Sequence, residues 1–159
     1  MSIWWSLHLR REAASVPLAR RLLLSAMETA GVDPDISFDL SLALSEACAN
    51  AVEHGGTGGP GAASQVYRVT AFLDGERCRI EVTDSGPGFP ARQKRRTAPQ
   101  NVLTHPAAPT GTWAESGRGL GLIEELSDHA DFRNRPGRGA MVSFDKALKW
   151  REDALLRAS

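Results

Sequence analysis

The chain has few cysteines, no net charge and no long hydrophobic run, and each absence excludes a class of protein. Cys48 and Cys78 are the only cysteines among 159 residues, and each lies in an apolar pattern. We therefore expect reduced core thiols of a cytoplasmic protein, not a disulfide framework. Nineteen basic side chains balance nineteen acidic ones, so no overall field draws the chain to nucleic acid or membrane. We expect neither a membrane span, which needs roughly 20 apolar residues, nor a signal peptide.

Length and patterning predict a single domain that contains both helices and strands. A first strand over residues 3–9 would point Trp4 and Trp5 to opposite faces, so that only one enters the core. A helix with Ser15 as its N-cap is expected to end near Gly31. The further predicted elements are a central helix over 36–54, a hairpin of strands 65–73 and 77–83, a helix opened by 117–121, strands near 130–134 and 140–144, and a terminal helix over 147–158.

The central helix carries an unusual pair of polar residues. Between Leu42 and Val52 nearly every residue is apolar or small, except Ser45, Glu46 and Asn50. Glu46 and Asn50 are four residues apart, so a helix places them on one face, one turn apart. They form either a polar site on a mostly buried helix or a surface pair without a role, and this helix alone does not decide between the two.

Two further stretches are rich in glycine. Asp84-Ser-Gly-Pro-Gly88 follows the second hairpin strand, and Gly117-Arg-Gly-Leu-Gly121 precedes a helical pattern. Alone, the first stretch is typical of a turn. The second resembles a dinucleotide fingerprint, but its spacing is wrong and no βαβ unit surrounds it.

The remaining irregular segments are open to several interpretations. The glycine-rich loop at 55–61 lacks the Lys-Ser/Thr ending of a P-loop. An irregular segment over about 90–116 indicates a lid, a binding loop or disorder. The basic run from Arg92 to Arg96 within it is a solvated patch, a nucleic-acid contact or a screen for a bound polyphosphate.

Taken together, the three motifs resemble those of a known superfamily. Glu46-x-x-x-Asn50, Asp84-x-Gly-x-Gly and Gly117-x-Gly-x-Gly are similar to the N-box and first two glycine boxes of the GHKL (Bergerat-fold) ATPases. In size and organisation the chain is most similar to the single-domain anti-sigma-factor serine kinases of the general-stress and sporulation type, from about residue 3 to residue 144. The resemblance implies one HATPase-like domain over 1–159, an α/β (α+β) two-layer sandwich. Its sheet would be mixed and largely antiparallel, with helices on one face.

The resemblance also implies ATP and Mg²⁺ as cofactors and gives the motif residues roles. Asn50 would supply one amide oxygen to Mg²⁺, whose octahedral shell phosphate oxygens complete. Glu46 would be the catalytic base for the attacking hydroxyl. Asp84 would accept a hydrogen bond from the adenine amino group. The other residues implied to contact the nucleotide are Gly86, Gly88, Gly117, Arg118, Gly119, Leu120 and Gly121; the last glycines would offer free N–H groups at a helix N-terminus.

The resemblance finally implies partners. The chain would bind a sigma factor, phosphorylate a STAS-type anti-sigma-factor antagonist, and form a homodimer for which the outward tryptophan is a candidate contact. One departure is Gly139-Ala140 where the superfamily often has Gly-Thr. An inactive ATP-dependent binding protein is the main alternative, although Glu46 argues for chemistry. A nucleic-acid module using Arg92–Arg96 is a further alternative, against which the balanced charge argues.

Overall fold

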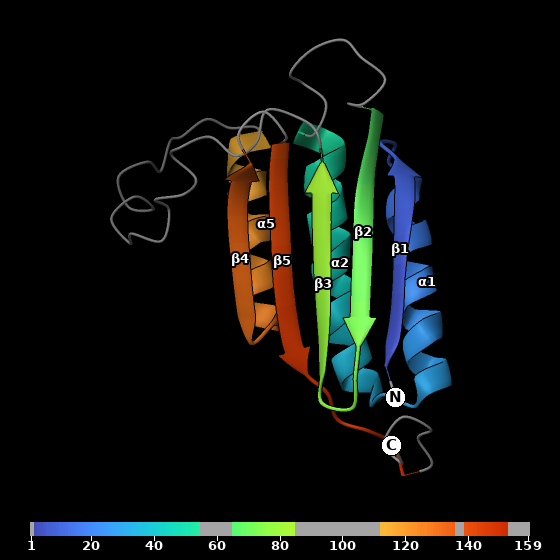
Figure 1. Cartoon of the computed structure of the whole chain (residues 1–159). Coiled ribbons are helices and arrows are strands. Elements are labelled where there is room, and N and C mark those ends of the chain that lie inside the picture. Colours follow the sequence, from blue (N-terminus) through green and yellow to red (C-terminus); the bar gives the residue numbers. More distant parts are fainter. Residues whose placement is uncertain (1, 55–64, 85–111, 136–138, 153–159) are drawn as a thin grey trace.

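A sheet with helices on one face makes up the described part of the chain (Figure 1). The computed structural model describes residues 2–54, 65–84, 112–135 and 139–152. Its strands are β1 (Ile3–Arg10), β2 (Val66–Leu73), β3 (Arg77–Asp84), β4 (His129–Arg135) and β5 (Gly139–Ala147), and its helices are α1 (Ser15–Ala30), α2 (Pro34–His54) and α5 (Thr112–Leu126). The predicted two-layer α+β sandwich is confirmed.

The sheet has the strand order β1-β2-β3-β5-β4. All four pairings between these described strands are antiparallel. The prediction of a largely antiparallel sheet is therefore confirmed, but the parallel component implied by "mixed" is not found among them. The reason is the route of the chain, which passes through α5 and β4 before β5 returns beside β3 in the opposite direction.

The predicted β2–β3 hairpin is confirmed, and its turn is held by one side chain. Asp74 Oδ1 accepts hydrogen bonds from the backbone N–H groups of Glu76 (2.7 Å) and Arg77 (2.8 Å). A short carboxylate suits this position because it can bond backbone groups two and three residues further on. The turn sets the hairpin register, so alternate residues of β2 and β3 face the helices.

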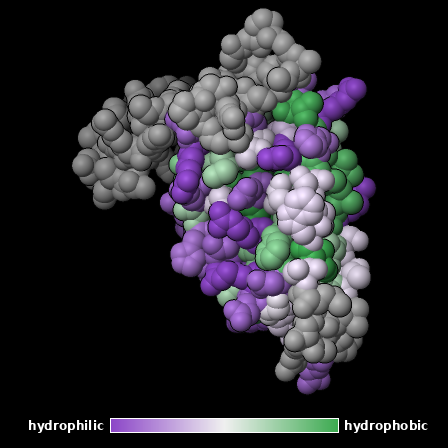
Figure 2. Space-filling view, viewed as in Figure 1, coloured by the Kyte–Doolittle hydropathy of each residue, from purple (hydrophilic) through white to green (hydrophobic). Residues whose placement is uncertain are grey.

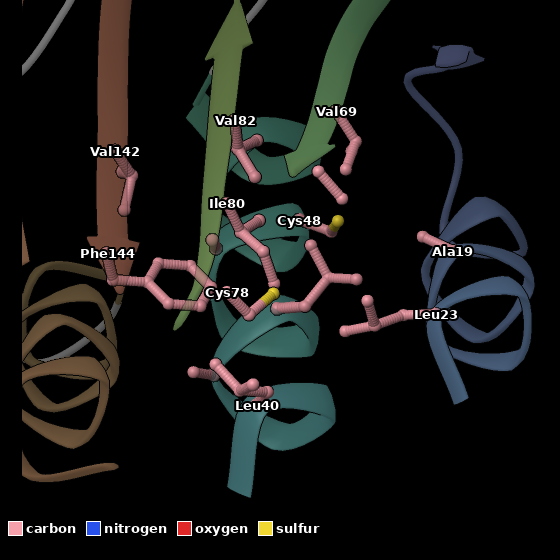
Figure 3. Packing of buried hydrophobic residues seen from close by; sticks show 14 of the residues in the cluster. Ala19, Leu23, Leu40, Cys48, Val69, Cys78, Ile80, Val82, Val142 and Phe144 are labelled. Atoms are coloured by element: carbon pink, nitrogen blue, oxygen red, sulfur yellow. The ribbon is translucent and has the colours of Figure 1, made fainter. Parts of the chain in front are cut away.

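The core lies between the sheet and α2, which packs between α1 and α5. Ala43, Ala47 and Ala51 repeat every fourth residue along the buried stripe of α2, where their small side chains allow close packing. Figure 3 shows neighbouring core residues: Leu40 and Cys48 from α2, Ile80, Val82 and Phe144 from the sheet, and Ala19 and Leu23 from α1. This packing fixes which face of α2 is turned away from the core.

No helix covers the other face of the sheet within the described residues (Figure 1). Trp4 is 64% exposed on this open face, whereas Trp5 is partly buried and packs against the core. The prediction that the two tryptophans point to opposite faces is therefore confirmed. Figure 2 shows hydrophilic side chains gathered over β4 and β5, and paler or hydrophobic ones over β1 and β2.

The start of α1 differs from the prediction. Ala14, not Ser15, occupies the N-cap position, and no side chain there bonds the backbone. The Ser15 hydroxyl is instead buried, donating to Glu12 O (2.7 Å) and sharing a hydrogen bond with the Tyr67 hydroxyl (2.6 Å). A buried Tyr hydroxyl needs a hydrogen-bond partner. The Ser15 hydroxyl supplies this partner and therefore does not cap the helix. The predicted end at Gly31, which has φ of 93°, is confirmed.

The predicted terminal helix is wrong over its described part. β5 continues to Ala147, and Trp150 then forms a bridge with Val32. Backbone hydrogen bonds to distant segments replace helical ones, among them Leu148 N to Glu76 O (2.8 Å). Trp150 nevertheless packs against the core as expected, and its Nε1 donates to Gly75 O (3.1 Å). Residues 153–159 lie outside the described residues.

Candidate functional site

A cavity of about 720 Å³ lies between α2 and α5. This volume is within the range of small-molecule sites, about 300–1,000 Å³. It is lined by Glu46, Ala49, Asn50 and Glu53 from α2 and by Gly119, Gly121, Leu122 and Glu125 from α5. The face of α2 that carries Glu46 and Asn50 therefore borders a cavity.

The packing of α2 positions its polar residues. Because the stripe of Ala47, Cys48 and Ala51 is buried, residues 46 and 50 are rotated away from the sheet and toward α5. The end of the helix is also held, since Arg11 donates to the carbonyl oxygen of Val52 (2.5 Å), one of the last carbonyls of α2. The part of α2 that carries Asn50 is thus anchored at both its buried face and its C-terminus.

Glu46, Asn50 and Gly119 meet at one point of the cavity. A Cβ atom at Gly119 would lie 3.7 Å from Glu46 Oε2 and 3.8 Å from Asn50 Nδ2. The missing side chain therefore leaves space that a ligand atom in contact with both groups would fill. Asn50 Nδ2 is buried without a hydrogen-bond partner among the described residues, and such a group calls for a partner.

This donor set fits Mg²⁺ and a polyphosphate. A carboxylate and an amide oxygen are hard ligands, and Mg²⁺ takes one or two protein oxygens while phosphates and waters complete its shell. In the described ranges there is no group of three His, Cys, Asp or Glu side chains that could hold a metal by itself. A protein-only metal cage is thus not found there, whereas a metal shared with phosphate oxygens suits the residues present.

The cavity is acidic. Its described lining residues include the three carboxylates Glu46, Glu53 and Glu125 and no Lys or Arg. None of the three belongs to an ion pair between described residues. A phosphate in this cavity requires a cation beside it, because like charges at short range repel.

Sequence reasoning did not single out Glu53 and Glu125. The signal was present, because Glu53 is seven residues after Glu46 and Glu125 is four after Gly121. Both spacings keep a residue on one helical face. Extending the face of each motif by one or two turns finds both residues.

Asp84 lies at the end of β3 and does not line this cavity. Its Oδ1 accepts a hydrogen bond from the backbone N–H of Ala140 (3.2 Å) at the start of β5. The structure therefore brings Glu46 and Asn50 together with Gly119 and Gly121, but it does not bring Asp84 into the same cavity. Gly86 and Gly88 lie outside the described residues.

The glycine triplet does not open a helix as predicted. α5 begins at Thr112, so Gly117, Gly119 and Gly121 lie beyond its first turn, where backbone N–H groups bond carbonyls within the helix. The Leu120 side chain is buried in the core, and the surroundings of the Arg118 side chain lie outside the described residues. Residues 112–116 of the predicted lid belong to α5, and 90–111 also lie outside the described residues.

Two thiols and a phenol form the buried titratable groups of the core. Burial raises the pKa of Cys48 from its ordinary value of 9.0 to about 12, and it does the same for Cys78. Burial also raises the pKa of the Tyr67 hydroxyl. Both cysteines are free and buried, which agrees with the predicted role as core residues and argues against a nucleophile, since the thiolate is the reactive form.

None of the helices in the described ranges combines the length and apolar character that crossing a membrane requires.

The sequence matches the family described as "Histidine kinase-like ATPase domain" over residues 9–146. The chain belongs to the histidine kinase-like ATPase family. Membership confirms the resemblance carried by the three motifs and agrees with the two-layer fold.

Curated relatives in this family include regulators of sigma factors. The chain is 34% identical over 107 residues to "Serine-protein kinase RsbW" from Bacillus pumilus (strain SAFR-032), covering 67% of this chain and 64% of the relative. It is 30% identical over 122 residues to "Anti-sigma F factor" from Thermoanaerobacter sp. (strain X514), covering 75% of this chain and 77% of the relative. The chain thus spans slightly less than two thirds of the first relative.

A solved structure shares the fold. The crystal structure of the RsbU and RsbW domains of Rv1364c from Mycobacterium tuberculosis matches with a TM-score of 0.60 and 22% identity. The match covers 91% of this chain and 32% of that one. At this identity the likeness supports the fold alone.

Proposed function

We propose that this chain is an ATP- and Mg²⁺-dependent serine/threonine-protein kinase that acts as an anti-sigma factor. One observation carries the proposal: Glu46 and Asn50 meet Gly119 in a cavity, and the Asn50 amide nitrogen is buried there without a hydrogen-bond partner among the described residues. A general base beside an amide whose oxygen can ligate Mg²⁺ is what phosphoryl transfer needs. A site that only binds a nucleotide does not need the carboxylate of Glu46.

In this proposal the two residues have separate roles. Asn50 would hold Mg²⁺ through its amide oxygen, and the bound ion would supply positive charge beside the phosphates. Glu46 accepts the proton of the attacking hydroxyl as that oxygen bonds to the γ-phosphorus, and the bond to the bridging oxygen of ADP breaks. Gly119 leaves room for the reacting groups between them.

The two glycine boxes complete the proposed nucleotide site. Asp84 reads the adenine amino group, with Gly86 and Gly88 allowing the backbone close to the base and ribose. The N–H groups of Gly117, Gly119, Leu120 and Gly121 bind phosphate, with Arg118 adding charge. Since these residues lie inside α5, phosphate binding requires α5 to open over residues 112–121, which glycines favour by their low helix propensity.

The proposed partners follow from the relatives. One is named a serine-protein kinase and another an anti-sigma F factor. We therefore propose that this chain binds a sigma factor and phosphorylates a protein. The resemblance of the motifs, and not these names, supports a STAS-type antagonist as the substrate and the cytoplasm as the location. We also propose a homodimer that involves the open face of the sheet near Trp4, which is 64% exposed.

A phosphotransfer assay with labelled ATP tests the proposal. The small STAS-type proteins of the same genome serve as acceptors. We expect Glu46→Gln to bind Mg-ATP normally and to lose transfer by about 10²–10⁴-fold, the usual contribution of a general base. Asn50→Ala should lose Mg²⁺-dependent ATP binding itself.

The matched control is Ser45→Ala, on the same helix. The Ser45 hydroxyl donates to Ser41 O (2.9 Å) and does not line the cavity, so both binding and transfer should stay near wild type. Unchanged transfer by Glu46→Gln refutes the base role. Mg-ATP binding without transfer to any acceptor points instead to an ATP-dependent binding protein.

A further inference from the structure

The carboxylate of Asp84 is held by the backbone of β5. The β3–β5 register ends with Thr83 opposite Met141. Ala140, which precedes Met141 in β5, donates its backbone N–H to the Asp84 side chain (3.2 Å). A backbone N–H is a donor only. It therefore requires an acceptor atom of residue 84 to face β5.

Gly139 makes this arrangement possible in two ways. Its φ is +100°, in a region that favours glycine. A Cβ atom there would lie 2.8 Å from Asp84 Oδ1 and closer still to the Asp84 carbonyl oxygen. Any side chain at position 139 must therefore displace both the backbone and the carboxylate of Asp84.

We propose that Gly139 and the N–H of Ala140 are positioning groups that set the nucleobase specificity of Asp84. The inference rests on the proposed function, in which Asp84 reads adenine. A carboxylate has about four acceptor sites, so it can accept hydrogen bonds from the Ala140 N–H and from the exocyclic amine of adenine at the same time. Guanine presents a carbonyl at that position, which a carboxylate does not bind.

The same geometry explains why alanine can occupy position 140, where the superfamily often has threonine. The hydrogen bond that holds Asp84, called the clamp from here on, uses the backbone N–H of residue 140. Every amino acid except proline has this N–H. A threonine hydroxyl is not needed to hold the carboxylate. Ala140 is only 6% exposed, so its methyl group packs where a hydroxyl would need a further partner.

Asp84→Asn tests the clamp without changing Gly139. The N–H of Ala140 requires the amide oxygen, which turns the amide nitrogen, a donor, toward the base. The preference should then shift from adenine to guanine, whose carbonyl accepts a hydrogen bond. Without the clamp the amide would rotate, present its oxygen to adenine and keep the preference for ATP.

Gly139→Ala tests the positioning role directly, and Gly75→Ala is its matched control. A Cβ atom at Gly75 meets no atom within 4 Å, and Gly75 is not among the glycines with positive φ. The same chemical change should therefore disturb only the variant at position 139. The double variant Asp84→Ala/Gly139→Ala should discriminate no worse than Asp84→Ala alone, because Gly139 acts through the carboxylate.

The experiment measures Kd for Mg-ATP and Mg-GTP, together with Tm, for the wild type and all variants. We expect the ratio of the two Kd values to favour ATP in the wild type and in Gly75→Ala. It should fall about tenfold or more in Gly139→Ala and shift toward GTP in Asp84→Asn. Tm separates a loss of folding from a loss of discrimination.

Two results would overturn the inference. One is a folded Gly139→Ala with the wild-type ratio, and the other is an Asp84→Asn that still prefers ATP as strongly as the parent. If Gly139→Ala does not fold, the nearly isosteric Asp84→Asn decides the question alone. Failure of the wild type to bind either nucleotide is a different result, because it refutes the proposed function itself.

Discussion

Cys48, Cys78 and Tyr67 show how strongly single residues of this core depend on burial. Desolvation is the largest cause of the raised pKa of each group, and the charges of Asp74 and Asp145 raise the pKa of Cys78 further. Each group is therefore neutral in the folded chain at pH values where it ionises in the unfolded chain. This difference links the stability of the fold to alkaline pH.

We predict that the free energy of unfolding falls as the pH rises from about 9 to about 12. Both thiols keep their protons in this window when folded, since their pKa is about 12, but lose them when unfolded. A raised folded pKa contributes stability that is fully present below the unfolded pKa of about 9 and is lost as the pH rises from there to about 12. The loss is up to about 1.4 kcal/mol per pH unit for each thiol.

Urea unfolding at a series of pH values from 8 to 11 measures this slope. Cys48→Ala loses packing and should be less stable at pH 8, but its stability should fall less steeply with pH because one titrating group is gone. Equal slopes in the two proteins contradict the assignment of this dependence to the thiol.

Residue spacing predicts one part of the site and not the other. Glu46 and Asn50 were found because four residues bring two side chains to one helical face. The contact between Asp84 and Ala140 spans 56 positions along the sequence, and no local sequence pattern predicts it. The positive φ of Gly139 depends on the same tertiary contact, so only the structure gives that glycine a role.

At the scale of elements, the glycines of α5 disfavour the helix that this segment forms. Gly119 and Gly121 lie inside the helix, where each glycine costs about 1 kcal/mol relative to alanine. In the proposed function α5 opens over residues 112–121 to bind phosphate. Glycine therefore lowers the free energy of that opening.

We predict that Gly121→Ala stabilises the unliganded protein and weakens Mg-ATP binding. A Cβ atom at this position meets nothing within 4 Å, so alanine should fit and raise the unfolding free energy by up to about 1 kcal/mol. Binding should weaken by a similar amount, about fivefold, because opening the helix costs more. Tm and the Kd for Mg-ATP measure the two effects.

Gly121→Ser separates helix propensity from steric blocking. Serine is larger than alanine but a poorer helix former. If opening of α5 limits binding, the serine variant should bind Mg-ATP more tightly than the alanine variant. The opposite order would mean that bulk in the cavity, and not helix stability, is responsible.

The elements that local signals predict well are those that tertiary contacts reinforce. The apolar stripe of α2 and the Asp74 turn of the hairpin point to the same structures as the final packing. The segment after Ala147 has a helical pattern, yet its backbone bonds to the chain near Glu76 and Gly31. These long-range hydrogen bonds outweigh a weak local preference, as does the burial of Ser15 against Tyr67.

At the scale of the whole molecule, the two faces of the sheet differ in what covers them. One is buried by α1, α2 and α5, whereas the other has no covering element among the described residues (Figure 1). Trp4 lies on this open face opposite Phe72 of the neighbouring strand. The two side chains are 64% and 38% exposed, and an aromatic pair so exposed at a sheet edge favours association.

We predict that the protein is a homodimer and that Trp4→Ser shifts it toward monomer. Because Trp4 is 64% exposed, its loss should change association far more than folding, so Tm at low concentration should stay close to the wild type. Sedimentation velocity over a concentration series measures the mass. Phe38→Ser is the matched control, since Phe38 is 52% exposed but lies on α2, on the opposite side of the sheet. A Trp4→Ser variant as dimeric as the parent, or a shift caused equally by Phe38→Ser, would show that the open face does not form the contact.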